Sequence, residues 1–497
     1  MYNSRLFHVI RRLETPELRK VDDFVRSPYF NKDKRVVDLW VYIRRFYPDL
    51  THPGLDRKAV CRALFQQGEA AENKLRAYMS RLARLIEAYM EQETLQSWPA
   101  LQDRLSVRTL RERGDHFFFS QEVERLGSRP EPGLVRTLDY FLEKWWLLHE
   151  AYFHSGSMKY DQDNQSLEEL IDTADEAFVL LKLRYACETI QRRRRLGHHY
   201  PVRMLDEISA AAAFFAPRNP LIAIYRQLLG LSLDPADEAA YQVSHRLVTD
   251  HFQDLEDFDK AFSIKLLLSH IFKRINESNL QAGLEAWTLY ALADKAGLIS
   301  PDGRVESDVY LNVVVCACLA GKFDWCHRFI GKYGDHLPES EREYIVNIAR
   351  AYWHYHQIGK GFSREEALEK ASSLLADTHY LNTAADLRFR SLQLRVFYEY
   401  YNELFEETRM VLSAADSFEK YLRRTNQFPA VTRSAYLKFV QLLRKLVKLR
   451  AMGRSAGCKK VLQLRQTVHN TELVALKHWL LDKLELFRTK LDCPEGN

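Results

Sequence analysis

The segment from Ser307 to Pro338 constrains the fold of this chain more than any other stretch. Its first part places four apolar residues on one helical face, namely Tyr310, Val313, Val314 and Ala317. Residues 320–324 interrupt that pattern, and a second helical face follows, made of Cys326, Phe329 and Ile330. The segment therefore predicts two helices joined by a short turn. Such a hairpin cannot bury its apolar face alone, so we expect further hairpins to stack on it.

Pairs of helical segments recur along most of the chain. They are expected over 256–276 with 280–297, 342–376, 384–402 with 405–424, and 431–452 with 458–490. Gly (19) and Pro (15) are scarce for 497 residues, which favours helices over a strand-rich fold with many tight turns. We therefore predict an all-α fold, a right-handed α-solenoid of stacked helical hairpins.

Three domains are expected from the same pattern. They are a mildly basic N-terminal helical domain (1–160), a hairpin array (161–425) and a C-terminal helical pair (426–497). The first boundary is placed at the stretch 155–165, which is polar and poor in aliphatic residues, as connecting segments usually are.

The central segments resemble tetratricopeptide repeats, which are helical hairpins of about 34 residues. Tyr310, the turn glycine Gly321 and Pro338 stand where that repeat has an early aromatic residue, a turn and a closing proline. Cys326 takes the position that a small alanine usually holds between the two helices. Tyr333 departs from the pattern, because a small residue belongs there. The resemblance implies a degenerate, tetratricopeptide-like array over roughly 165–425.

Three short motifs resemble an uncharacterised family of bacterial helix-rich proteins of about this length. They are Ser27-Pro-Tyr-Phe-Asn-Lys32, Lys182-Leu-Arg184, and Trp479-Leu480 followed by Lys483. The resemblance covers most of the chain and implies a helix-rich architecture. It carries no activity with it.

The compartment is predicted from cysteine usage and from apolar runs. Seven cysteines, an odd number set mostly within helical apolar patterns, favour a reducing compartment over a disulfide framework. The N-terminal segment lacks the continuous apolar core of a signal peptide. The longest apolar run, 313–320, is far shorter than the about 20 residues that span a bilayer. We therefore expect a cytoplasmic protein without membrane contact.

No motif in the sequence predicts catalysis or a cofactor. Cys316, Cys318 and Cys326-His327 could be read as metal ligands, but residues two apart on a helix point about 200° away from each other. These cysteines are therefore predicted to be small packing residues in the hairpin core. Phosphate-binding loops, nucleophile elbows and acidic metal clusters are absent from the sequence. We expect no enzymatic activity, no metal and no cofactor.

The densest charge run consists of four arginines, Arg192, Arg193, Arg194 and Arg195. One interpretation is a contact with phosphate or an acidic peptide, because arginine's planar guanidinium pairs well with such anions. The other is a helix C-terminus that stops at Gly197, where the helix dipole favours positive charge. The position of the run at a helix end favours the second interpretation.

The N-terminal part contains a second candidate for nucleic acid. Residues 1–90 hold 18 Lys and Arg against 11 Asp and Glu, while the remainder of the chain is nearly balanced. The basic helix pair 56–90 resembles the helical part of winged-helix regulators, in which Arg76, Arg81 and Arg84 would face phosphates and bases. A wing is missing, because no alternating strand pair flanks 56–90. An ordinary hairpin with solvated arginines is therefore favoured.

These observations favour an interaction or scaffold protein without enzymatic activity. Stacked hairpins leave a concave surface, whose side chains form a continuous groove for a peptide or protein partner. The alternative, from a different class, is a DNA-associated transcriptional regulator that uses the helix pair 56–90. A polar and aromatic groove within 165–425 would favour the first hypothesis, and a strand pair beside 56–90 the second.

Overall fold

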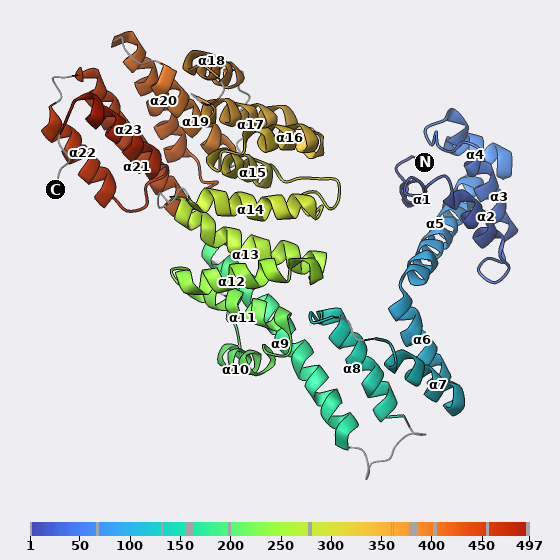
Figure 1. Ribbon diagram of the computed structural model, residues 1–497. Helices are drawn as coiled ribbons and strands as arrows, with labels where there is room; N and C mark the ends of the chain where they lie inside the picture. The colour runs from blue at the N-terminus through green and yellow to red at the C-terminus, as the bar shows by residue number, and fades with distance from the viewer. Residues whose placement is uncertain are drawn as a thin grey trace. The chain divides into compact units, whose positions relative to one another are not determined.

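The computed structural model describes residues 2–65, 69–130, 133–154, 164–196, 200–276, 281–358, 360, 362–376, 385–400, 405–453 and 457–493. Within these ranges the chain forms 23 α-helices and no β-strand, and helix accounts for 78% of the structure (Figure 1). The predicted all-α class is confirmed. No helix in the described part of the chain is long and apolar enough to cross a membrane.

The chain divides into two compact units, and each is described by itself. Unit 1 comprises residues 1–131 and 142–173, and unit 2 comprises 132–141 and 174–497. The boundary predicted at 155–165 falls largely on 155–163, which lie outside the described residues. Two helices, α8 (Leu138–Tyr152) and α9 (Asn164–Leu196), carry residues of both units.

Unit 1 is organised around one long helix, α5 (Glu69–Ser97). Leu82 and Ile86 of α5 share one helix face, because they are four residues apart. Both are fully buried and belong to the same core as Trp40. The shorter helices of unit 1 pack on α5 or follow it in the chain; they are α1 (Arg5–Ile10), α2 (Glu17–Arg26), α3 (Lys34–Arg44), α4 (Arg57–Leu64), α6 (Pro99–Glu112) and α7 (His116–Gly127).

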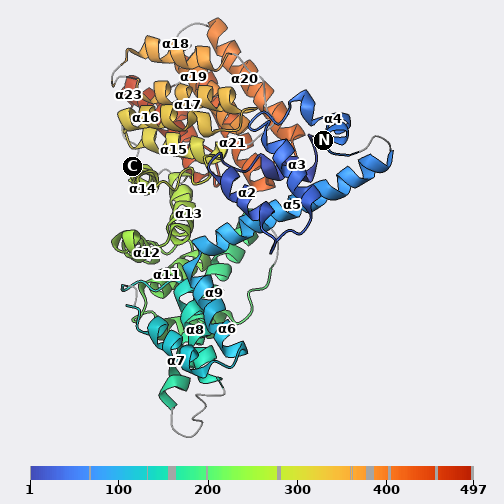
Figure 2. The same ribbon diagram turned by 90° about the vertical axis from the view of Figure 1, so that its right-hand side faces the viewer.

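Unit 2 is a succession of helices in which each packs on its neighbours in the chain. Several also contact the next helix but one, so that α15, α17 and α19 lie side by side (Figures 1 and 2). The first helices are α10 (Leu205–Phe215), α11 (Pro220–Leu233), α12 (Glu238–Asp250), α13 (Asp257–Asn276), α14 (Gln281–Lys295), α15 (Ser307–Leu319) and α16 (Phe323–Tyr333). The last are α17 (Arg342–His356), α18 (Arg364–Leu374), α19 (Ala385–Tyr400), α20 (Phe405–Arg424), α21 (Ala430–Ala451), α22 (Cys458–Asn470) and α23 (Lys477–Lys490).

The hairpin predicted over 307–338 is present as α15 and α16. The turn between them contains Gly321 at a φ of +68°, a conformation that residues with a Cβ adopt rarely. Tyr310 is fully buried and donates its hydroxyl hydrogen to the carbonyl oxygen of Ile330 at 3.0 Å. Cys326 is also fully buried, with its Sγ atom 3.9 Å from Cys318 Sγ. It therefore lies in the contact between the two helices, against Cys318 and Val314 of α15.

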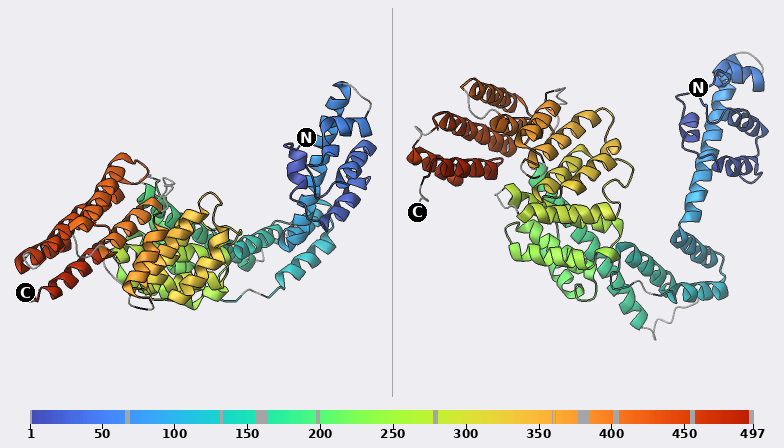
Figure 3. Two further views of the ribbon diagram at one scale, coloured as in Figure 1. Left: turned by 90° about the horizontal axis from the view of Figure 1, so that it is seen from above. Right: turned by 45° about the horizontal axis from the view of Figure 1, so that its top comes forward.

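The predicted C-terminal helical pair is wrong, because the segment holds three helices, α21, α22 and α23 (Figure 3, right). The single helix expected over 458–490 breaks after Asn470, where Leu473 and Leu476 adopt φ angles of 49° and 53°. Helix α23 folds back along α22, and a disulfide joins Cys458 to Cys493 with 5.4 Å between their Cα atoms. Cysteine usage predicts thiols and a reducing compartment, and the disulfide contradicts that prediction for Cys458 and Cys493. The other five cysteines are buried thiols.

A buried ion pair connects three helices in the first part of unit 2. Arg184 on α9 donates from Nη2 to Asp259 Oδ2 on α13 at 2.7 Å, and Tyr225 on α11 donates to Asp259 Oδ1 at 2.6 Å. Burial raises the pKa of the Asp259 carboxyl, and the two hydrogen bonds oppose that shift. The motif 182–184, which carried the family resemblance, thus contains a residue with a structural role.

We expect Cys326→Leu to lower the free energy of unfolding by roughly 1–3 kcal/mol, because added methylenes must overpack the space between α15 and α16. Chemical denaturation followed by circular dichroism measures this loss. Arg328→Leu, on the exposed side of the same helix, is the matched control and should be nearly neutral. Equal stability of Cys326→Leu and the natural protein would show that this position is not tightly packed.

Candidate functional site

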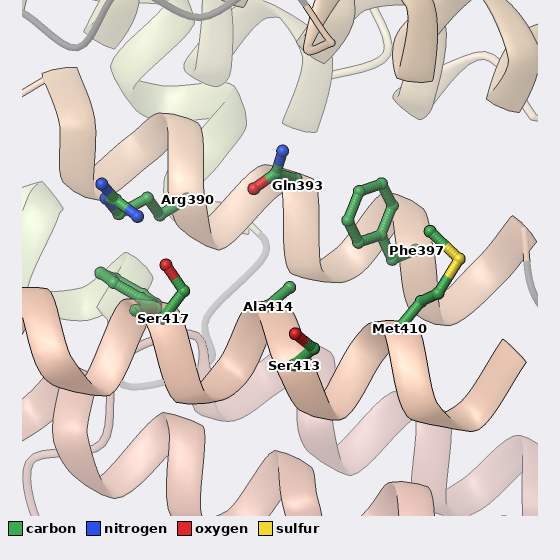
Figure 4. Close-up of a pocket in the computed structure, with 8 residues that line it drawn as sticks. Arg390, Gln393, Phe397, Met410, Ser413, Ala414 and Ser417 are labelled. Carbon is green, nitrogen blue, oxygen red and sulfur yellow. The ribbon is translucent and has the colours of Figure 1, made fainter.

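A pocket of about 300 Å³ lies between α19 and α20 in unit 2 (Figure 4). Side chains from the two helices face each other across it in two rows. The row on α19 is Arg390, Gln393 and Phe397, and the row on α20 is Met410, Ser413, Ala414, Ser417 and Phe418. Each row follows one helix face. On α19 the lining residues are three and four apart, and on α20 residues 410, 413 and 417, and residues 414 and 418, are likewise three or four apart.

The shape of the pocket follows from the side chains on α20. Ser413, Ala414 and Ser417 are small, so they leave space opposite the larger residues of α19. Phe418 is buried, whereas Met410 is 48% exposed and stands at one end of its row (Figure 4). The pocket therefore offers apolar surface, two hydroxyl groups and one amide within a single, partly open cleft.

The charge of the pocket is positive. Arg390 is the charged member of the lining, and its guanidinium lies over the ring of Tyr421, 4.5 Å from the centroid. Burial, together with the nearby Asp386 carboxylate, raises the pKa of Tyr421, so that its phenol stays protonated. Asp386 is itself fully buried and accepts a hydrogen bond from Tyr344 at 2.9 Å. Arg390, which is half-buried, is the charged side chain that lines this end of the pocket.

The pocket-lining row is the third stripe of a helix that is buried on its other sides. One stripe of α19 joins the core of the preceding helices and another joins the core of the C-terminal helices; these stripes are Phe389, Leu392 and Val396, and Leu387, Leu394 and Tyr398. Two buried faces fix the rotation of α19 about its axis. The side chains of the third stripe consequently have a fixed position in the pocket.

The arginines predicted for nucleic-acid contact lie on α5, and one of the three is paired within the protein. Arg81 donates from Nη1 to Asp33 Oδ2 at 2.7 Å, and Asp33 also caps α3. Arg76 and Arg84 are exposed, about 80° apart around the helix, and form no ion pair with any residue that the structure describes. No strand accompanies α4 and α5 within the described ranges. Two of the three arginines therefore remain available to a ligand.

The arginine run at 192–195 lies in the last turn of α9, where the helix dipole favours cations. Arg192 donates to Glu188 Oε1 at 2.7 Å, and Arg193 donates to the carbonyl oxygen of Tyr200 at 2.6 Å. The side chains of Arg194 and Arg195 lie outside the part of the chain that the structure describes. For Arg192 and Arg193, intramolecular contacts already account for the charge.

The three cysteines whose sequence pattern could be read as metal ligands, Cys316, Cys318 and Cys326, are buried packing residues of the central hairpin. Cys316 and Cys318 are buried in α15, and burial raises the pKa of both thiols, which keeps them protonated and poor ligands. Among the described residues no group of three or more His, Cys, Asp and Glu side chains is arranged to hold a metal ion.

The sequence alone does not predict the pocket between α19 and α20. Serine and alanine at 413, 414 and 417 were a signal on the α20 pattern, since small residues at helical spacing mark a face that packs closely or leaves space. Their opposing row on α19 could be recognised only once the two helices were paired. Comparisons with known protein families, with characterised proteins and with solved structures find no match to this chain.

We expect the arginines of α5 to read no DNA sequence, because Arg81 is paired and no strand that could form a wing lies beside the helix in the part of the chain that the structure describes. Selection from random duplexes at physiological salt should enrich no motif, either with the natural protein or with Arg76, Arg81 and Arg84 all changed to alanine. An enriched motif that disappears in the triple variant would establish α5 as a recognition helix.

Proposed function

We propose that this protein is a non-enzymatic interaction or scaffold protein that binds a peptide segment of a partner in the pocket between α19 and α20. The single observation that carries the proposal is the composition of that pocket. Apolar side chains, two serine hydroxyls and an amide line one cleft, and a guanidinium stands at its end. These groups suit a segment with one apolar anchor and a nearby carboxylate.

The surrounding helices support this proposal. Consecutive helices of unit 2 contact each other, and α15, α17 and α19 also contact one another. We propose that they form a right-handed solenoid of the tetratricopeptide kind. The Cys458–Cys493 disulfide does not support the reducing, cytoplasmic location expected from cysteine usage, so no compartment is part of the proposal. In such an array, side chains of successive helices line one surface, so a segment anchored between α19 and α20 can contact neighbouring helices as well.

The size of the pocket defines what it can hold. At about 300 Å³ it lies at the small end of ligand sites, which suits one or two side chains rather than a large cofactor. Affinity must then come from one well-buried anchor plus contacts on the helix surface around it. We therefore propose a partner segment in an extended or helical form, with an acidic residue close to its apolar anchor.

The proposal predicts that filling the pocket abolishes binding. Peptides selected from a random library against the whole protein should be rich in acidic residues next to an apolar residue. Ser413→Trp places an indole over the small residues of α20, so we expect the selected peptides to bind at least tenfold more weakly to it in a titration. Arg390→Gln should weaken the acidic peptides by roughly 1.5–3 kcal/mol, the usual contribution of a charge-assisted hydrogen bond.

Ser434→Trp is the matched control, since Ser434 is an exposed serine on the neighbouring helix α21. It should leave the affinity unchanged. Peptides that bind Ser413→Trp as well as the natural protein would place the binding surface elsewhere and contradict the assignment of this pocket.

A further inference from the structure

Three helices of unit 2 meet at one end of the C-terminal segment. Lys438, in the first half of α21, donates from Nζ to the carbonyl oxygen of Glu472, just past the end of α22, at 2.8 Å. Helices α21 and α22 therefore run antiparallel, and the second half of α21 lies beside the start of α22. The disulfide between Cys458 and Cys493 brings the end of α23 to the same place (Figure 3).

Five exposed lysines lie in the parts of the three helices that are nearest this end, and we refer to them as the lysine cluster; they are Lys445 and Lys448 on α21, Lys459 and Lys460 on α22, and Lys490 on α23. None of the five forms an ion pair or side-chain hydrogen bond with a residue that the structure describes. Nearby cations behave differently, since Arg488 pairs with Glu485 and Lys483 pairs with Glu399. Asp492 contributes one exposed carboxylate. The lysine cluster therefore carries a largely uncompensated positive charge.

Beyond residue 90, the positive charge of the chain is concentrated in this segment. Residues 430–497 hold 14 Lys and Arg against 5 Asp and Glu, whereas residues 91–429 hold 40 against 51. Helix α21 alone has six cations and no carboxylate. A net charge of +9 thus adjoins a body of net charge −11, so a polyanion would be attracted to this segment and repelled by the preceding one.

Helix stability does not explain the lysines at the start of α22. Lys459 and Lys460 lie in its first turn, where the helix dipole disfavours cations, and no acidic residue occupies that turn. Residues that break a local rule without a structural gain are expected at functional sites. Their position points to a ligand that supplies negative charge.

We propose that this lysine cluster binds the phosphate backbone of a nucleic acid without reading its sequence. Neighbouring helices pack about 8–10 Å apart, so lysines from three of them span on the order of 20 Å. Duplex DNA presents one charge per about 1.7 Å of its axis, or roughly ten charges over that span. Lysine is a compact point charge that suits phosphate and lacks the planar fork with which arginine reads guanine.

An anionic membrane is the less favoured ligand. Peripheral membrane binding usually requires a broad apolar face that enters the lipid. At this end the large apolar side chains exposed among the described residues are Met452 and Leu486. Contact with phosphates needs charge alone.

The test is fluorescence anisotropy with a labelled duplex of about 20 base pairs and the whole, disulfide-intact protein over a series of salt concentrations. Five phosphate contacts predict a slope of log K against log salt of about −4.5. Changing Lys459, Lys460 and Lys490 to glutamate should weaken binding at least tenfold at about 50 mM salt and reduce the slope to about −2. Unrelated duplex sequences should bind alike.

The control removes the same charge elsewhere in unit 2, with Lys295, Arg304 and Arg328, all exposed, changed to glutamate. It should bind like the natural protein. Equal loss in both triple variants, no loss in either, or binding to phosphatidylserine vesicles but not to the duplex would overturn the proposal. None of these outcomes bears on the α19–α20 pocket, which contains none of the substituted residues.

Discussion

One buried carboxylate, that of Glu399 on α19, holds together the helices on which both proposed surfaces depend. Glu399 is 7% exposed, and it accepts a hydrogen bond from Arg364 Nη2 of α18 at 2.7 Å. Lys483 of α23 forms an ion pair with its other oxygen. A carboxylate at this depth is tolerated because two cations compensate it, and either cation alone would leave part of its charge unpaired. The ion pairs therefore couple α18, α19 and α23.

Aromatic contacts reinforce this junction. Trp479 of α23 donates from Nε1 to the hydroxyl oxygen of Tyr355 on α17 at 2.7 Å, and its ring lies edge-on to that of Tyr398. Burial, with Arg395 nearby, lowers the pKa of His356, so this histidine stays neutral at physiological pH. The motif 479–483 thus connects the pocket-bearing helix α19 to the basic helices α21 to α23.

Helical periodicity predicted most helices of unit 2 because a buried stripe repeats every three to four residues whatever it packs against. It failed at Asn470, where no glycine or proline marks the break and the continuing apolar pattern reads as one helix. As a single helix, 458–490 would separate its ends by about 48 Å, so helical periodicity did not predict the pairing of Cys458 with Cys493. The pocket was missed for a related reason, since it needs the pairing of two helices. The basic C-terminal segment does not stand out in the net charge of residues 91–497, because the negative charge of residues 91–429 cancels it.

Hydrogen exchange followed by mass spectrometry tests the role of Glu399 most directly. Glu399→Gln keeps the shape of the side chain but removes the charge that Arg364 and Lys483 share. Exchange should then become faster in both 364–374 and 477–490, two segments that are far apart in sequence and meet at this residue. Glu112→Gln, which removes a surface pair with Arg108 outside both segments, should change neither of them. Natural exchange rates in both segments of Glu399→Gln would show that the buried carboxylate does not hold these helices together.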